Sequence, residues 1–74
     1  MSWNYRVMRY YGIDNISRFG VFEVYYENDK VKSWTEGEVT VSVENTYANL
    51  IAELECIQKA FTKPILDHKT GLEI

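Results

Sequence analysis

Residues 45–62, NTYANLIAELECIQKAFT, decide the fold of this chain. Apolar residues recur in this stretch at the three- and four-residue spacing that places side chains along one side of a helix. Asn45 or Thr46 can cap the first turn, and Pro64 stops the helix because it lacks a backbone N–H. We expect this apolar stripe to cover a sheet. The stripe consists of Tyr47, Leu50, Ile51, Leu54, Ile57 and Phe61.

The residues before this helix alternate with the period of two that is typical of β-strands. Residues 3–10 and 19–27 are rich in aromatic and branched side chains, and residues 31–35 return after a turn at Asn28-Asp29. Residues 39–43 form a fourth short strand or continue the third. The sequence therefore predicts an α+β domain of two layers, in which an antiparallel meander of three to four strands packs on one C-terminal helix.

A chain of 74 residues has room for one domain. We place this domain at residues 1–66 and expect residues 67–74 to form a flexible C-terminal tail. So small a domain buries only about 60% of its unfolded surface, so its stability is marginal. Cys56 is the only cysteine, and an unpaired cysteine is typical of the cytoplasm. Self-association would supply burial that a disulfide cannot.

The net charge of -3 argues against general binding to nucleic acids or anionic membranes, because both require a basic surface. No apolar run is long enough to span a bilayer. The first residues also lack the basic head and apolar run of a signal peptide. We therefore expect a cytoplasmic protein that does not contact a membrane.

The sequence offers little to support catalysis. A nucleophile needs a base within hydrogen-bond reach, and the only histidine, His68, lies in the expected tail. A zinc site needs about four ligands, which one histidine and one cysteine cannot supply. The glycines are scattered and form no phosphate-binding loop. We expect a non-catalytic protein without a cofactor or metal.

The hairpin at Asn28-Asp29 allows two registers, which differ in where they place Trp34. A two-residue turn puts Trp34 on the outer face of the sheet, whereas a three-residue turn with a bulge puts it in the core. We favour the outer position because Val31 then joins the core and Lys32 stays in water. Tyr5 and Val7 would face the helix, and the core face of the second strand would carry Phe22, Val24 and Tyr26.

The outer face of the predicted sheet is the candidate site. Tyrosine, tryptophan, methionine and arginine are enriched where proteins bind one another, so we expect this face to bind a protein partner or a second copy as a homodimer. The alternatives are a solvated face with cross-strand pairs and a face that stacks on nucleic acid bases. The expected partner-binding residues are Arg6, Met8, Glu23, Tyr25, Lys32 and Trp34.

Four segments resemble a family of small uncharacterised bacterial proteins. They are Trp-Asn-Tyr-Arg-Val-Met at residues 3–8, Phe-Glu-Val-Tyr-Tyr at 22–26, Ser-Trp-Thr at 33–35 and Lys-Pro-Ile-Leu-Asp at 63–67. This resemblance covers most of the chain and implies no particular activity. The function that best fits the sequence is therefore a small protein-binding or self-associating module.

More remotely, the layout is similar to the N-terminal domain of HicB-like antitoxins. In that family a three-stranded meander precedes a helix opened by a Thr or Ser cap, here Asn45-Thr46. The family domain resembles a partial ribonuclease H fold without catalytic carboxylates, and it binds a small ribonuclease toxin. The family's Pro-Asp-Leu-Pro-Gly segment is missing, and Glu27-Asn28-Asp29-Lys30 stands in its place. This resemblance implies an alternative function as an antitoxin-like or nucleic-acid-binding regulator that uses the outer sheet face.

Overall fold

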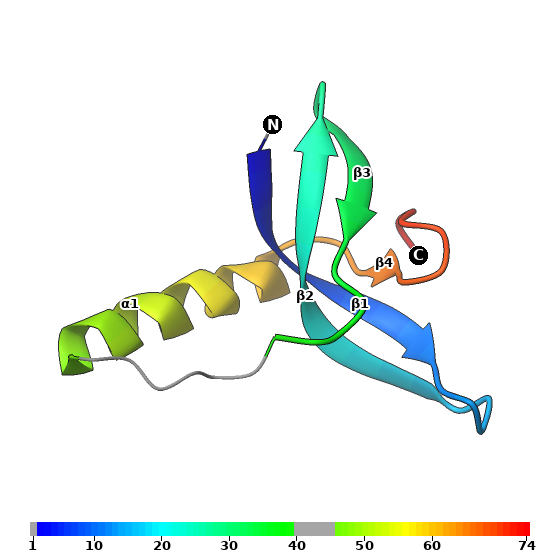
Figure 1. Ribbon diagram of the computed structural model, residues 1–74, viewed down its shortest axis with the longest axis horizontal. Coiled ribbons are helices and arrows are strands. Elements are labelled where there is room, and N and C mark those ends of the chain that lie inside the picture. Colours follow the sequence, from blue (N-terminus) through cyan, green and yellow to red (C-terminus); the bar gives the residue numbers. More distant parts are fainter. Residues whose placement is uncertain (1, 40–45) are drawn as a thin grey trace.

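A computed structural model describes residues 2–39 and 46–74, and within them the chain forms a curled, mixed four-stranded sheet and a C-terminal α-helix (Figure 1). The strands, in the sheet order β3-β2-β1-β4, are β1 (Ser2–Tyr11), β2 (Ser17–Glu27), β3 (Lys30–Trp34) and β4 (Leu66–Asp67). The helix α1 (Tyr47–Gln58) continues into a 3-10 turn, η1 (Lys59–Thr62). The predicted α+β class is confirmed.

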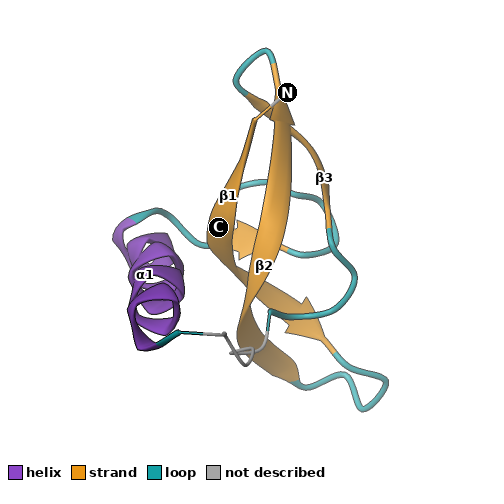
Figure 2. Cartoon of the chain, turned by 60° about the vertical axis from the view of Figure 1, so that its left-hand side comes forward, coloured by secondary structure: helices purple, strands orange, loops and turns teal. Residues whose placement is uncertain are grey.

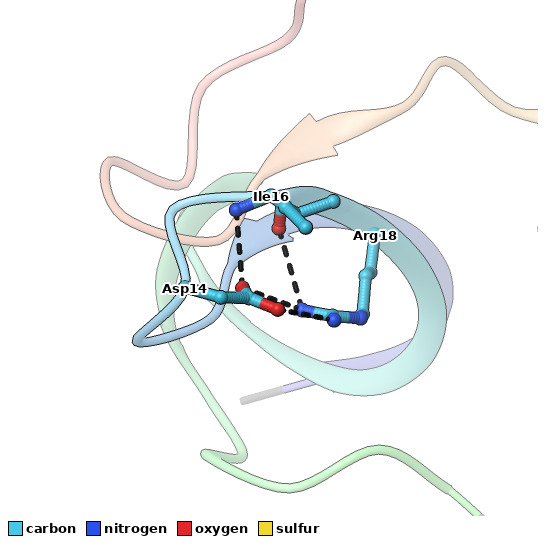
Figure 3. A network of polar contacts seen from close by, with 3 residues as sticks. All are labelled: Asp14, Ile16 and Arg18. Atoms are coloured by element: carbon cyan, nitrogen blue, oxygen red, sulfur yellow. Dashed lines mark hydrogen bonds and ion pairs between the residues drawn. The ribbon is translucent and has the colours of Figure 1, made fainter.

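The loop between β1 and β2 is held by a compact set of polar bonds (Figure 3). The Asp14 carboxylate accepts the Ile16 backbone N–H at 3.1 Å and both terminal nitrogens of Arg18, at 3.0 and 2.6 Å. The Arg18 guanidinium, followed by the Ile16 N–H, lowers the pKa of Asp14. Asn15 adopts a left-handed φ of 59°, which asparagine tolerates. The loop therefore turns the chain tightly without a proline or glycine at its tip.

The hairpin between β2 and β3 combines features of both predicted registers. Asn28 and Asp29 have φ values of 53° and 63°, as a two-residue hairpin turn requires, and Val31 lies opposite Tyr26 on the core side as predicted. The register then shifts at a bulge, so that Trp34 lies opposite Val24.

The predicted outer position of Trp34 is therefore wrong. Our two alternatives tied the position of Trp34 to the length of the turn, whereas the chain keeps the short turn and adds the extra residue later in the strand. Lys32 is that residue, and it forms an exposed ion pair with Glu27. The bulge lets Val31 and Trp34 both point toward the core, which a regular strand would not permit.

The main buried cluster lies on one face of β1, β2 and β3. Met8, Phe22, Val24 and Leu66 are buried there. The side chains around them are aromatic or branched and partly buried, namely Tyr10, Tyr26, Val31 and Trp34. Phe22 and Val24 thus lie on the core face, as the sequence predicted, but the helix does not cover this face.

Residues 66–74 cover the core face instead. Leu66 and Asp67 pair in parallel with Met8 and Arg9 of β1, and the Ile74 N–H donates to the Ile65 carbonyl at 2.9 Å. The centroid of the His68 ring lies 4.7 Å from that of Phe22. The expected flexible tail is thus hydrogen-bonded to the sheet and packed on the core.

The helix lies on the opposite side of the sheet (Figure 2). Tyr5 and Val7 alternate with Arg6 and Met8 along β1 and therefore point toward α1, as predicted. The Tyr5 hydroxyl donates to Glu53 of α1 at 2.6 Å. Thr46 caps the helix by accepting the Asn49 N–H at 3.1 Å. Asn45, the other predicted cap, lies outside the described residues.

The segment after β3 follows the free edge of β2 up to the limit of the described residues. Thr35 N–H donates to the Glu23 carbonyl at 3.1 Å, and Val39 N–H donates to the Val21 carbonyl at 2.7 Å. The predicted fourth strand at residues 39–43 falls almost wholly outside the described part of the chain. The fourth strand of the sheet is instead β4, which pairs with β1 and forms the edge opposite β3.

Candidate interaction surface

The six residues predicted to bind a partner do not share one face of the sheet. The β1–β2 register places Arg6 opposite Phe22, so Arg6 and Met8 lie on the same side as Phe22. Trp34 joins them through the bulge. Glu23 and Tyr25 point to the other side, toward α1. The predicted outer face was assembled from opposite sides because each strand was assigned its faces separately.

Arg6 and Met8 are buried inside the protein. Met8 is fully buried in the core, and Arg6 is 7% exposed. The Arg6 guanidinium donates to the Tyr26 hydroxyl at 2.8 Å and to the Pro64 carbonyl at 2.7 Å. Its Nε has no acceptor within the described residues. Arg6 therefore connects β1, β2 and the segment after η1, and it cannot reach a partner from this position.

Arg9, the next arginine along β1, is also engaged. It pairs with Asp67 at 3.2 Å, and its guanidinium carbon lies 5.6 Å from the centroid of the Tyr11 ring. The Asp67 carboxylate also accepts the Lys69 backbone N–H at 2.7 Å. That backbone bond and, less strongly, Arg9 lower the pKa of Asp67 against the opposing effect of desolvation. These bonds fix β4 and the loop after it to the end of β1.

Two rows of side chains run along α1 and η1. The inner row faces the sheet. Its members in α1 are only partly buried, and only Ala60, in η1, is fully buried. The inner row consists of Leu50, Glu53, Ile57 and Ala60. The hydrogen bond to the Glu53 carboxylate raises the pKa of the Tyr5 hydroxyl, and burial of Tyr5 raises it further. Tyr5 therefore stays protonated and holds α1 against β1.

The outer row is exposed, and it is the most extensive apolar feature of the helix. Tyr47 is 78% exposed, Leu54 42% and Phe61 67%. The helix packs on the sheet as predicted, but no residue of α1 is buried, so the apolar stripe is not enclosed there. The outer row consists of Tyr47, Ile51, Leu54, Gln58 and Phe61.

The outer row continues onto the sheet. Phe61 lines a shallow apolar hollow of about 170 Å³ with Val7, Phe19, Gly20 and Val21. Phe19 is itself 61% exposed at the start of β2. The apolar surface thus extends from the first turn of α1, past η1, to the sheet, which gives a partner both a helix and a strand to contact.

A second hollow, of about 410 Å³, lies on the other flank of α1. It is lined by Trp3, Asn4, Tyr5, Cys56, Lys59 and Lys63. The rings of Trp3 and Tyr5 meet edge to face at 5.2 Å, and Cys56 is exposed. The residues of this hollow supply cationic and aromatic groups but no acidic group.

The described part of the chain gathers no group of three or more His, Cys, Asp or Glu side chains that could hold a metal ion. Within the same residues, no helix is long and apolar enough to cross a membrane. His68, the only histidine, packs between the rings of Phe22, Tyr10 and Trp34. Its Nε2 lies 3.3 Å from the Thr35 carbonyl oxygen.

Comparisons with protein-family models, curated proteins and solved structures found no match to the chain. The resemblances to a small bacterial family and to HicB-like antitoxins therefore stay predictions.

Sequence reasoning found the four apolar residues of the outer row but assigned them to the side of the helix that faces the sheet. The breadth of the stripe gave no signal against burial. Leu50 and Ile57 lie at one margin of the stripe and Ile51 at the other, yet the whole stripe has the width of about 100° that is usual for a helix facing one sheet. The width of the stripe therefore did not indicate which of its residues would stay exposed.

Proposed function

We propose that this protein is a non-catalytic module that acts by binding another protein chain through the outer row of α1. The observation that carries the proposal is the exposure of this row, in which Tyr47, Leu54 and Phe61 are each at least 42% exposed. Exposed apolar side chains that adjoin one another are typical of sites that another molecule covers. Covering them removes apolar area from water, which contributes about 25 cal/mol per Å².

The use of the polar side chains supports the non-catalytic part of the proposal. Arg6, Arg9 and Glu53 are each engaged with a residue more than forty positions away in the chain, at Pro64, Asp67 and Tyr5 respectively. These bonds hold the helix and the C-terminal segment to β1. These three charged side chains therefore position elements of the fold, and the outer row is the surface that we propose to bind the partner.

A comparison of two charged variants tests this proposal. A chain tagged for affinity capture in its own host is expected to retain a stoichiometric protein partner, whether an untagged copy or another polypeptide. Leu54→Lys should abolish the capture, because a charge in the centre of the outer row would be buried in the complex. Ala52→Lys is the matched control: it adds the same charge at an exposed position on the opposite side of the helix and should retain the partner.

Equal capture by the wild type and Leu54→Lys would overturn the proposal. So would the lack of any stoichiometric partner of the wild-type chain. Circular dichroism of both variants serves as the check on folding, and both should match the wild type because the substituted residues are exposed.

A further inference from the structure

We infer that a second copy of this chain covers the outer row, with the two α1 helices packed antiparallel about a two-fold axis between Ile51 and Leu54. The inference rests on the proposed function and names the partner. Three features of the protein support it: its excess surface, the spacing of the outer row and the way α1 projects from the sheet.

The surface of a single copy is larger than its mass predicts. A monomeric protein of 8.7 kDa is expected to expose about 4,700 Å², whereas this chain exposes 5562 Å². The radius of gyration is 13.1 Å, against about 11 Å for a compact domain of this length. The excess, roughly 850 Å², is close to the about 800 Å² that each partner buries in a standard interface.

The spacing of the outer row is that of a helix-pairing seam. Its members, at positions 47, 51, 54, 58 and 61, are separated by steps of four, three, four and three residues. This is the alternation by which the apolar seams of two helices interlock side by side. Because a second copy carries the same seam, two α1 helices complement each other without any further element, as a two-fold interface requires.

An antiparallel arrangement matches the chemistry along this seam. In the layer next to the axis, Ile51 lies opposite Leu54 of the partner subunit, which places the branched apolar side chains at the centre. In the next layer, Tyr47 lies opposite Gln58 of the partner subunit. The phenol hydroxyl and the amide can then hydrogen-bond at the two ends of the seam, where water is close.

The direction of α1 also favours the antiparallel arrangement. The helix begins away from the sheet, contacts β1 from Glu53 onward and lies nearest to it at η1 (Figure 1). Antiparallel packing lays the free first half of each helix along the anchored second half of the other. It also opposes the two helix dipoles, whereas a parallel pair would align them and bring both sheets to the same end.

Paired cysteine variants test the arrangement. In a Cys56→Ser background, two separate proteins carry Tyr47→Cys and Gln58→Cys and are distinguished by tags of different mass. Mild oxidation of the mixture should give mainly the mixed disulfide, because these two positions face each other only in an antiparallel pair. Disulfides formed mainly within each variant would indicate a parallel pair and overturn the inference.

Analytical ultracentrifugation tests the identity of the partner. The purified wild type and Ala52→Lys should sediment at twice the chain mass. The dissociation constant of the Leu54→Lys dimer should be at least tenfold higher than that of the wild type. Ile51→Lys provides a second variant on the other side of the axis, should Leu54→Lys be unfolded by circular dichroism. A wild type that stays monomeric at millimolar concentration overturns the inference.

The two proposals can fail separately. If the purified chain is monomeric but Leu54→Lys alone loses a different polypeptide from the host, the second copy is wrong and the proposed function stands. If Leu54→Lys neither lowers the mass nor loses a partner, both proposals are wrong.

Discussion

At position 71, both the backbone conformation and the packing require glycine. Its φ of +74° lies in the left-handed region, and a Cβ built there would overlap the Trp34 ring. We expect Gly71→Ala to lower the free energy of unfolding by about 2–4 kcal/mol, because it adds backbone strain to overpacking. Urea denaturation followed by tryptophan fluorescence would measure the change.

Gly37→Ala is the matched control for this prediction. A Cβ at Gly37 would meet nothing within 4 Å, and its φ is not positive. Its denaturation midpoint should therefore stay near that of the wild type. A Gly71→Ala midpoint equal to that of Gly37→Ala would show that Trp34 does not pack against this turn.

Residues with distant partners were the hardest to place from the sequence. Arg6 reads as a surface residue because an isolated arginine in an alternating strand is usually exposed. Its partners, Tyr26 and Pro64, lie 20 and 58 positions away, and no local pattern indicates them. The Asn28-Asp29 turn, in contrast, was predictable, because both residues tolerate the positive φ that the turn requires.

Among the elements, α1 was predicted well in extent and poorly in its contacts. The sequence placed it at residues 45–62, and α1 with η1 spans residues 47–62. Caps and helical spacing are local signals, which explains this agreement. Which side of the sheet a helix covers depends on strand register. No local sequence pattern indicated the bulge at Lys32, so the register could not be predicted.

The weak contact of α1 with its own sheet has a measurable consequence. We expect the amide hydrogens of α1 to exchange faster than those of β1 and β2 in dilute solution, because the helix buries no residue. Protection should rise with protein concentration as copies associate. Hydrogen exchange followed by mass spectrometry at two concentrations would show it.

The variant Leu54→Lys separates association from intrinsic helix stability in this experiment. Its α1 amides should exchange fast at both concentrations, while its β1 and β2 amides should match those of the wild type. Protection of α1 equal to that of β2 in dilute Leu54→Lys would mean that the single chain stabilises its helix without a partner.

At the scale of the whole molecule, the sheet separates two surfaces of different origin. The core face is closed by the chain's own C-terminal segment, through Leu66, His68 and Gly71, whereas α1 lies on the other face and leaves its outer row exposed. The sequence predicted one covered face and one free face. The prediction exchanged the two faces because the segment after Pro64 is short and has no helical or strand periodicity that would indicate a cover.

This closure makes the stability of the chain depend on residues 68–74. Removing them would expose the Phe22 and Trp34 rings and leave β4 with one neighbour, a loss of several kcal/mol in a domain whose total stability is about 5–15 kcal/mol. We therefore expect a chain ending at Asp67 to lose its cooperative thermal transition. Leu72→Ser, at an exposed position of the same segment, should retain it. A truncated chain that unfolds at the wild-type temperature would instead mean that these residues are the flexible tail that composition alone suggests.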